Sequence, residues 1–228
     1  MLKDPSSYVL AVGALGTAAF ALVDSSKVVL GGVSNCGFGQ IRGVVTRLFP
    51  ASGPQTPPLP LNRMLGVLRA NWLNGTPLGD QKQIAKTLIK LRLNADSAGH
   101  LARVTGVDAE LLTSVARKIA SGQSLDQPEQ DVFGRFDLIL TTLLDEGYQR
   151  ADQIYRNTAK AAAMVVSVVL AYLGGWAIAA GPFLAYCFSA DAGIALLTGL
   201  IATPLAPISK DLASGITAAT KAIGLLRK

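Results

Sequence analysis

Charged residues are scarce in this sequence: only 16% of its 228 residues are Asp, Glu, Lys or Arg, whereas 50% are hydrophobic. A soluble domain usually has closer to a quarter of charged residues. The scarcity is concentrated in one stretch, since Asp191 is the only charged residue between positions 161 and 208. Such a stretch excludes a surface helix of a soluble protein and indicates membrane segments.

Cysteine and histidine are also nearly missing. The two cysteines, Cys36 and Cys187, lie far apart, and His100 is the single histidine. Neither cysteine has a second Cys or His at zinc-ligand spacing, so the sequence offers no zinc site and no disulfide framework. The sequence also has no Gly-x-Ser-x-Gly elbow and no paired carboxylates in an apolar setting. We therefore expect no catalytic residues, no cofactor, no metal and no enzymatic activity.

Two apolar stretches near the C-terminus are long enough to cross a bilayer. Residues 161–181 carry no charge and end at a Gly-Pro pair, which breaks helices. After a short connection, residues 192–208 predict a return helix that Pro204 and Pro207 are expected to kink or end. Because a hydrocarbon core of ~30 Å needs about 20 apolar residues as a helix, residues 161–208 predict a transmembrane helical hairpin.

A third apolar stretch, residues 8–23, is slightly short for a span. We favour a transmembrane helix within residues 1–26. Two alternatives remain open: a cleaved signal peptide, because residues 19–21 (Ala-Phe-Ala) resemble a cleavage site, and a re-entrant or interfacial helix. The basic start that a signal peptide needs is poor, since Lys3 is followed by Asp4.

Lysine and arginine are concentrated between the first and second predicted spans. Residues 24–160 contain 16 of the 21 basic residues, and residues 182–191 contain none. The positive-inside rule then places the middle segment and the C-terminus in the cytoplasm. We therefore predict a multi-pass protein of a bacterial inner membrane. The middle segment has 16 basic and 12 acidic residues, and its net charge of +4 is too mild to indicate nucleic-acid binding.

The middle segment predicts a run of helices. Five prolines within residues 50–60 indicate an extended linker that ends a juxtamembrane segment, residues 27–60. A helical cytoplasmic domain, residues 61–160, should follow. Two of its expected helices cover residues 62–73 and residues 96 or 97 to 104. Another should be capped by Asp80, with Ile84, Leu88 and Leu91 on its buried face. A fourth should run from the Asp108 cap to Gly122, with a buried face formed by Leu111, Leu112, Val115 and Ile119. A last helix should start near Gln127 and continue into the second span, and residues 209–228 should form a weakly amphipathic tail.

Five glycines in residues 28–43, VVLGGVSNCGFGQIRG, suggest a phosphate-binding loop at first sight. Gly32 and Gly37 have the P-loop spacing, but the Lys and the Ser or Thr that would bind phosphate and magnesium are missing. Apolar residues recur every three or four positions, which favours an amphipathic helix over residues 27–49 at the membrane surface. A loop followed by a shorter helix from Phe38 fits nearly as well.

Several residues are candidates for contacts with lipid or between helices. Basic residues at the predicted membrane surface could bind lipid phosphates: Arg42, Arg47, Lys160 and Lys210. Charged residues at span ends could line a polar path, although the ordinary role of a span end is favoured: Asp24, Lys27 and Asp191. Small residues spaced by four could pack helices closely: Gly13, Thr17 and Ala21, and Gly199 with Thr203.

One short motif suggests a binding module. Residues 102–112, ARVTGVDAELL, resemble the core of a helix-turn-helix, with a turn glycine before the second helix. Asp108 and Glu110 would face DNA phosphates badly, so nucleic acid is an unlikely partner. The alternative function is a membrane-tethered module whose residues 102–119 contact nucleic acid or a cytosolic protein.

Together these patterns predict an all-α integral membrane protein with about three transmembrane helices and a helical cytoplasmic domain between the first and second. The leading hypothesis is a non-enzymatic scaffold, anchor or small pore that assembles with itself or with a protein partner. Membrane lipids are the other expected partners.

Overall fold

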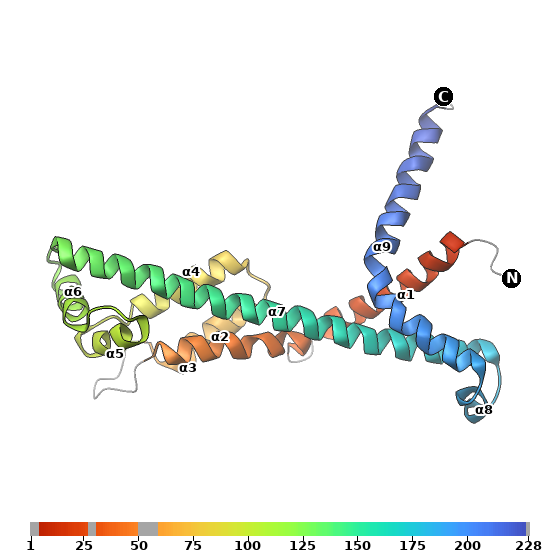
Figure 1. Cartoon of the computed structure of the whole chain (residues 1–228), viewed down its shortest axis with the longest axis horizontal. Helices are drawn as coiled ribbons and strands as arrows, with labels where there is room; N and C mark the ends of the chain where they lie inside the picture. The colour runs from red at the N-terminus through yellow and green to blue at the C-terminus, as the bar shows by residue number, and fades with distance from the viewer. Residues whose placement is uncertain (1–4, 27–30, 50–58, 227–228) are drawn as a thin grey trace. The chain divides into compact units, whose positions relative to one another are not determined.

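The computed structural model describes residues 5–26, 31–49 and 59–226, and leaves out the side chains of residues 5–7, 212–213 and 215–226. Every regular element in the described ranges is a helix (Figure 1), which confirms the all-α prediction for that part of the chain. The chain divides into two compact units. The apolar unit comprises Met1–Val33 and Arg156–Lys228, and the central unit comprises Ser34–Tyr155.

The central unit consists of short helices and the first part of a long one. A 3-10 helix, η2 (Gly32–Ser34), leads into it, and its helices are α2 (Asn35–Arg47), α3 (Leu61–Leu73), α4 (Leu78–Lys90), α5 (Ala95–Thr105), α6 (Ala109–Ser121) and the beginning of α7 (Gln127–Ala179). Local sequence determines several of these helix ends. Asn94 and Ser97 form a capping box before α5, and Asp108 caps α6. Gly106 and Gly122 end the two helices with φ angles of 68° and 69°.

Large apolar side chains form the core of the central unit. Phe136, Leu140, Leu144 and Tyr148 follow one another at intervals of four along α7, and all are almost completely buried. Side chains of α2 to α6 cover this stripe. Four residues per step keep one helix face toward the core, so the period of the sequence positions α7 at the centre of the unit.

The glycine-rich segment leads into this core through α2, whose apolar face packs against other helices. Gly31 and Gly32 adopt positive φ angles of 87° and 46°, and α2 then starts at Asn35. The apolar face of α2 is buried in the central unit through Ile41, Val44, Val45, Leu48 and Phe49. Burial against other helices removes this face from water, so lipid is not needed to cover it. Residues 27–30 lie outside the described ranges.

Two glycines allow α2 and α7 to approach closely. A Cβ atom on Gly37 would lie 2.5 Å from the carbonyl oxygen of Ala151, and one on Gly147 would lie 2.7 Å from a methyl group of Val44. Neither position has room for a side chain. Gly37, one of the five glycines in residues 28–43, therefore serves helix packing, and Gly147 is a second contact point.

Ion pairs connect α4 to α7. Lys82 donates to Asp145 at 2.5 Å, Lys86 donates to Asp137 at 2.8 Å, and Lys90 also pairs with Asp137. Burial by itself would raise the pKa of Asp137, but the hydrogen bonds from the two lysines outweigh it and hold that pKa below its ordinary value. These pairs fix which face of α4 meets α7.

Three local expectations in the central unit differ from the structure. Pro77 precedes α4 and Asp80 lies in its first turn, so Asp80 does not cap the helix. Leu91 and Ile119, expected in the core, are 64% and 49% exposed. The fully buried residues of α4 are Gln81, Ala85 and Ile89, and the expected Ile84 and Leu88 pack against the core while partly buried.

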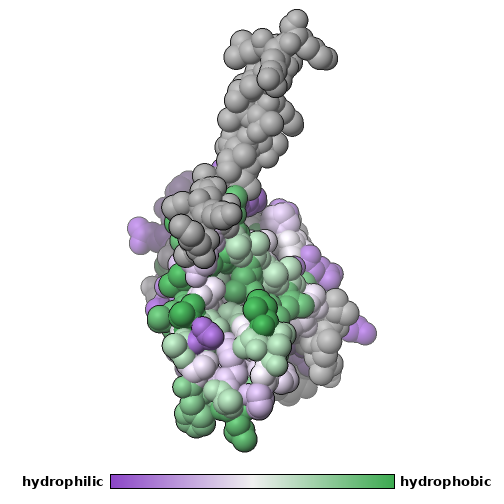
Figure 2. All heavy atoms as spheres, turned by 90° about the vertical axis from the view of Figure 1, so that its right-hand side faces the viewer, coloured by the Kyte–Doolittle hydropathy of each residue, from purple (hydrophilic) through white to green (hydrophobic). Residues whose placement is uncertain are grey.

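The apolar unit contains α1 (Pro5–Ser25), the end of α7, the short α8 (Phe183–Cys187) and α9 (Ala190–Leu226). Three helices are long and apolar enough to cross a membrane, through Tyr8–Ser25, part of Gln127–Ala179 and Ala190–Asp211. This confirms the three apolar helices expected from the sequence. Figure 2 shows mainly apolar side chains on the face of this unit that is turned to the viewer.

The second helix of the predicted hairpin does not end at its prolines. Pro204 and Pro207 lie inside α9, which bends midway and continues to Leu226 (Figure 1). A proline removes one backbone hydrogen bond and bends a helix, but the neighbouring turns can continue it. The tail is therefore part of α9, while the apolar face expected for residues 209–228 falls mostly on side chains outside the description.

Candidate functional site

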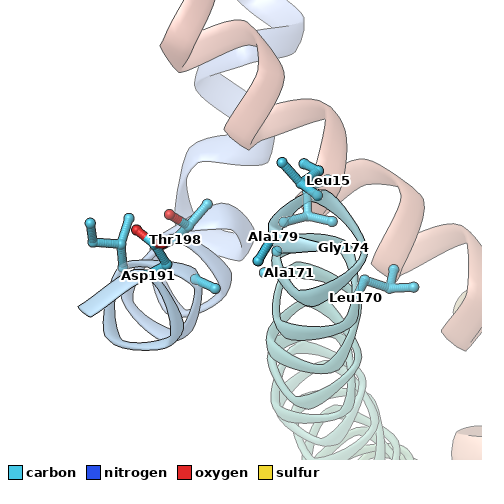
Figure 3. A pocket seen from close by; sticks show the side chains of 11 residues that line it. Leu15, Leu170, Ala171, Gly174, Ala179, Asp191 and Thr198 are labelled. Carbon is cyan, nitrogen blue, oxygen red and sulfur yellow. The ribbon is translucent and has the colours of Figure 1, made fainter. Parts of the chain in front are cut away.

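The main candidate site is a groove in the apolar unit. Its volume is about 530 Å³, and all three long apolar helices line it (Figure 3). Leu15 comes from α1, residues 170–179 of α7 form one wall, and residues 191–198 of α9 form the other. Asp191 and Thr198 lie on α9, across from Ala171 and Ala179 on α7. Asp191 is the one charged residue among the described residues that line the groove.

Small residues create this groove. The wall formed by α7 contains Ala171, Gly174, Gly175 and Ala179, and α9 contributes Ala195. A Cβ atom on Gly174 would meet nothing within 4 Å, so the missing side chain leaves open space. The small residues that form the groove are visible in the sequence. Small residues also allow helices to pack closely, so their number alone does not predict a groove.

Asp191 lies in the first turn of α9 and is exposed. The N-terminus of a helix carries a partial positive charge, which favours a carboxylate there. The sequence placed Asp191 at a span end and left open whether it could line a polar path. The structure places it at one end of an otherwise apolar groove.

A buried hydroxyl group adjoins the groove. Tyr186 of α8 is only 4% exposed, and its Oη atom has no hydrogen-bond partner among the described residues. A Cβ atom added to Gly175 would lie 2.3 Å from this oxygen and 3.2 Å from Cβ of Ala195. Gly175 and Ala195 line the groove. A buried hydroxyl without a partner is costly, and this oxygen packs against Gly175 with almost no accessible surface. No pattern in the sequence marks Tyr186.

Close backbone contacts connect α9 to α7. A Cβ atom on Gly199 would lie 2.4 Å from Cα of Val168. Ser167 donates a hydrogen bond to the carbonyl oxygen of Gly199 at 2.7 Å, and its Oγ lies 3.2 Å from Oγ1 of Thr203. Gly199 and Thr203 therefore lie where two helices meet. Ser167 was not among the sequence candidates.

The other predicted strip of small residues does not share one face. Gly13 is buried, and a Cβ atom there would lie 2.0 Å from Oγ of Ser209 on α9. Thr17 and Ala21 are exposed, and Thr17 donates its hydroxyl proton to the carbonyl oxygen of Gly13. A spacing of four drifts around the helix, and Gly16, three residues after Gly13, makes the next close contact with α9.

None of the remaining charged candidates that the structure describes lines the groove. Asp24 is exposed at the end of α1 and takes part in an interaction there, and Lys27 lies outside the described ranges. The four candidates for lipid phosphate are all exposed: Arg42 and Arg47 on α2, Lys160 on α7 and Lys210 on α9. Arg42 and Arg47 belong to the central unit, and Lys160 and Lys210 belong to the apolar unit.

A smaller groove lies in the central unit between α2 and α7. It has a volume of about 240 Å³, and Gln40, Arg47, Glu146 and Arg150 contribute to its lining. Arg150 pairs with Glu146 at 2.7 Å. His100, the single histidine, has its Nε2 atom 2.9 Å from the carbonyl oxygen of Arg47. The histidine thus has a backbone partner at the end of α2.

The helix-turn-helix-like segment contains two packed helices, α5 and α6, with Gly106 at the turn. Lys118 near the end of α6 donates to Glu129 at 2.6 Å. This hydrogen bond, together with one from Ser114, lowers the pKa of Glu129 to about 2. Because Lys118 is engaged in this pair, it is poorly placed to contact phosphates.

No group of three His, Cys, Asp or Glu side chains in the described ranges could hold a metal ion. Comparison with protein families, with curated proteins and with solved structures gives no match for this chain. Function must therefore be inferred from the residues and their geometry.

Proposed function

We propose that the protein is a non-enzymatic scaffold or anchor of a bacterial inner membrane, with the central unit and the C-terminus in the cytoplasm. The observation that carries the proposal is the combination of two units in one chain. One has three helices apolar enough to cross a bilayer, and the other has a core of its own. The continuous helix α7 belongs to both.

The distribution of charge supports the proposed orientation. Basic residues are concentrated in residues 24–160, and the connection 182–191 has none. The positive-inside rule relates such a bias to the cytoplasmic side. The same connection carries Phe183, Leu184 and Phe188, which are all exposed, and aromatic residues are common where spans meet the membrane surface.

The surface of the central unit fits a protein partner better than nucleic acid. Leu91 and Leu138 are 64% and 69% exposed. Around the helix-turn-helix-like segment, Asp108 and Glu110 are exposed, while Lys118 is paired with Glu129. Exposed apolar side chains suit contacts between proteins, and exposed carboxylates repel phosphates. Assembly with a second copy is the simplest form of this proposal.

The mass of the full-length protein in mild detergent and in lipid nanodiscs tests self-assembly. The proposal predicts a defined oligomer, and Leu138→Asp should shift it toward the monomer because a charge would be buried in the contact. Gln130→Asp, an exposed position on the same helix, serves as the control for the added charge. A protein that is monomeric at every concentration and in both environments contradicts the self-assembling form of the proposal.

A further inference from the structure

The groove of the apolar unit has the length of one lipid leaflet. Its wall on α7 runs from Leu170 to Ala179, and nine helical steps of 1.5 Å give about 14 Å. Half of a ~30 Å hydrocarbon core is about 15 Å. Asp191 lies at the end of the groove nearest the hairpin connection, since it is in the first turn of α9. An extended acyl chain could therefore lie along the wall with its polar end at Asp191.

The volume of the groove suits a small ligand or a single lipid chain. About 530 Å³ lies within the range of roughly 300–1,000 Å³ that is typical of ligand pockets.

The polar groups at the groove indicate the chemistry of the lipid headgroup. Asp191 provides a negative charge, and no Lys or Arg occurs among the described lining residues. A headgroup that carries an ammonium group complements this carboxylate, whereas an anionic headgroup without a cationic group would be repelled.

We propose that this groove binds one aminophospholipid, with its primary ammonium group at Asp191 and one acyl chain along α7. The ammonium group donates charge-assisted hydrogen bonds to the carboxylate. This inference requires that the three helices lie in a bilayer, but it does not depend on assembly through the central unit.

Native mass spectrometry of the full-length protein in mild detergent can compare three lipids with identical acyl chains. These are phosphatidylethanolamine, phosphatidylcholine, whose methylated ammonium has no N–H donor, and anionic phosphatidylglycerol. The proposal predicts one tightly retained phosphatidylethanolamine, bound about fivefold to tenfold more strongly than the other two lipids, as expected for charge-assisted hydrogen bonds at an exposed carboxylate. Equal retention of all three lipids, or retention of none, overturns the proposal.

Substitution of Asp191 provides the matched test. Asp191→Asn should abolish the preference for phosphatidylethanolamine over phosphatidylcholine while the chain-dependent binding remains. Asp211→Asn makes the same change at an exposed position of α9 that does not line the groove, and it should keep the preference. A preference that survives Asp191→Asn, or that Asp211→Asn removes equally, contradicts the assignment of the headgroup.

Discussion

The two units bury opposite kinds of side chain. The largest fully buried side chains among the described residues, such as Phe136 and Tyr148, all belong to the central unit. In the apolar unit the buried positions are mostly alanine, serine and threonine, whereas Ile178 and Phe188 are 87% and 90% exposed. The central unit follows the rule for proteins in water. The apolar unit follows the rule for membranes, where large apolar residues face lipid and small residues let helices approach.

The difference shows that mean hydropathy alone does not describe a core. Water drives large apolar side chains of the central unit together. Lipid tails are as apolar as leucine, so helices in a bilayer gain little from burying such side chains and associate through close packing and hydrogen bonds. The close approach of Gly199 to Val168 and the hydrogen bond from Ser167 are the counterparts of the Phe136 core.

The largest effect is expected for a cavity in the central core. Phe136→Ala removes a ring that is fully buried, and it should lower the free energy of unfolding of the central unit by about 3–5 kcal/mol. Phe188→Ala, at a side chain that is 90% exposed, should cost less than about 0.5 kcal/mol. Hydrogen exchange of the full-length protein measures both. Equal losses would contradict the division into two kinds of packing.

A small residue should be more sensitive than a large one in the apolar unit. Gly199→Ala places a Cβ atom 2.4 Å from Cα of Val168, and the necessary backbone shift should cost about 1–3 kcal/mol. Gly193→Ala on the same helix meets nothing within 4 Å and should be neutral or stabilising by up to about 1 kcal/mol. Thermal unfolding in detergent should show opposite or clearly different shifts; two similar shifts would show that α7 and α9 are not closely packed there.

Acid should weaken the central unit through Glu129. Its pKa is about 2 in the folded protein, below the ordinary 4.5, because Lys118 and Ser114 donate hydrogen bonds to it. The contribution is fully present above about pH 4.5 and is lost as the pH falls toward 2, since the unfolded chain takes up the proton first. Glu129→Gln should therefore flatten the pH dependence of unfolding between pH 4.5 and 2.

The control for this prediction is Glu110→Gln on α6. It also removes one negative charge, but it leaves the hydrogen bond between Lys118 and Glu129 intact. Fluorescence-detected unfolding at several pH values gives the slopes. A slope in Glu129→Gln as steep as that of the natural sequence would show that the ion pair does not stabilise the folded state.

The smallest effect is expected at the end of α7. Ala180 adopts a φ angle of 52°, the left-handed region that glycine tolerates and alanine does not. Ala180→Gly should relieve this strain but gain entropy in the unfolded chain, leaving a net stabilisation of about 0.5 kcal/mol. The melting temperature in detergent should rise by about 1–2 °C. A decrease would indicate that the helix end does not have this conformation.

Much of the fold could be predicted because local signals determine it. Asp108 and Gly122 mark the ends of α6, and the stripe from Phe136 to Tyr148 has the period of a buried helix face. Local signals could not predict what packs against the apolar face of a helix. The apolar side of α2 suits lipid and protein equally, and only tertiary packing assigns it to the central core.

The groove was only partly predictable for the same reason. Asp191 is conspicuous as a single charge in an apolar stretch. Tyr186 is not, because its importance depends on contact with Gly175 across the hairpin. Pro204 and Pro207 predicted a kink or a helix end, and local sequence could not decide between them; α9 bends and continues beyond both prolines (Figure 1).

Accessibility of Cys36 tests the central claim, that the apolar unit lies in the membrane and the central unit in the cytoplasm. Cys36 is exposed in the central unit, and the Cys187→Ser variant leaves it as the single thiol. A membrane-impermeant maleimide should label it at once in inverted membrane vesicles, and in right-side-out vesicles only after they are opened. Labelling in intact right-side-out vesicles would contradict the account.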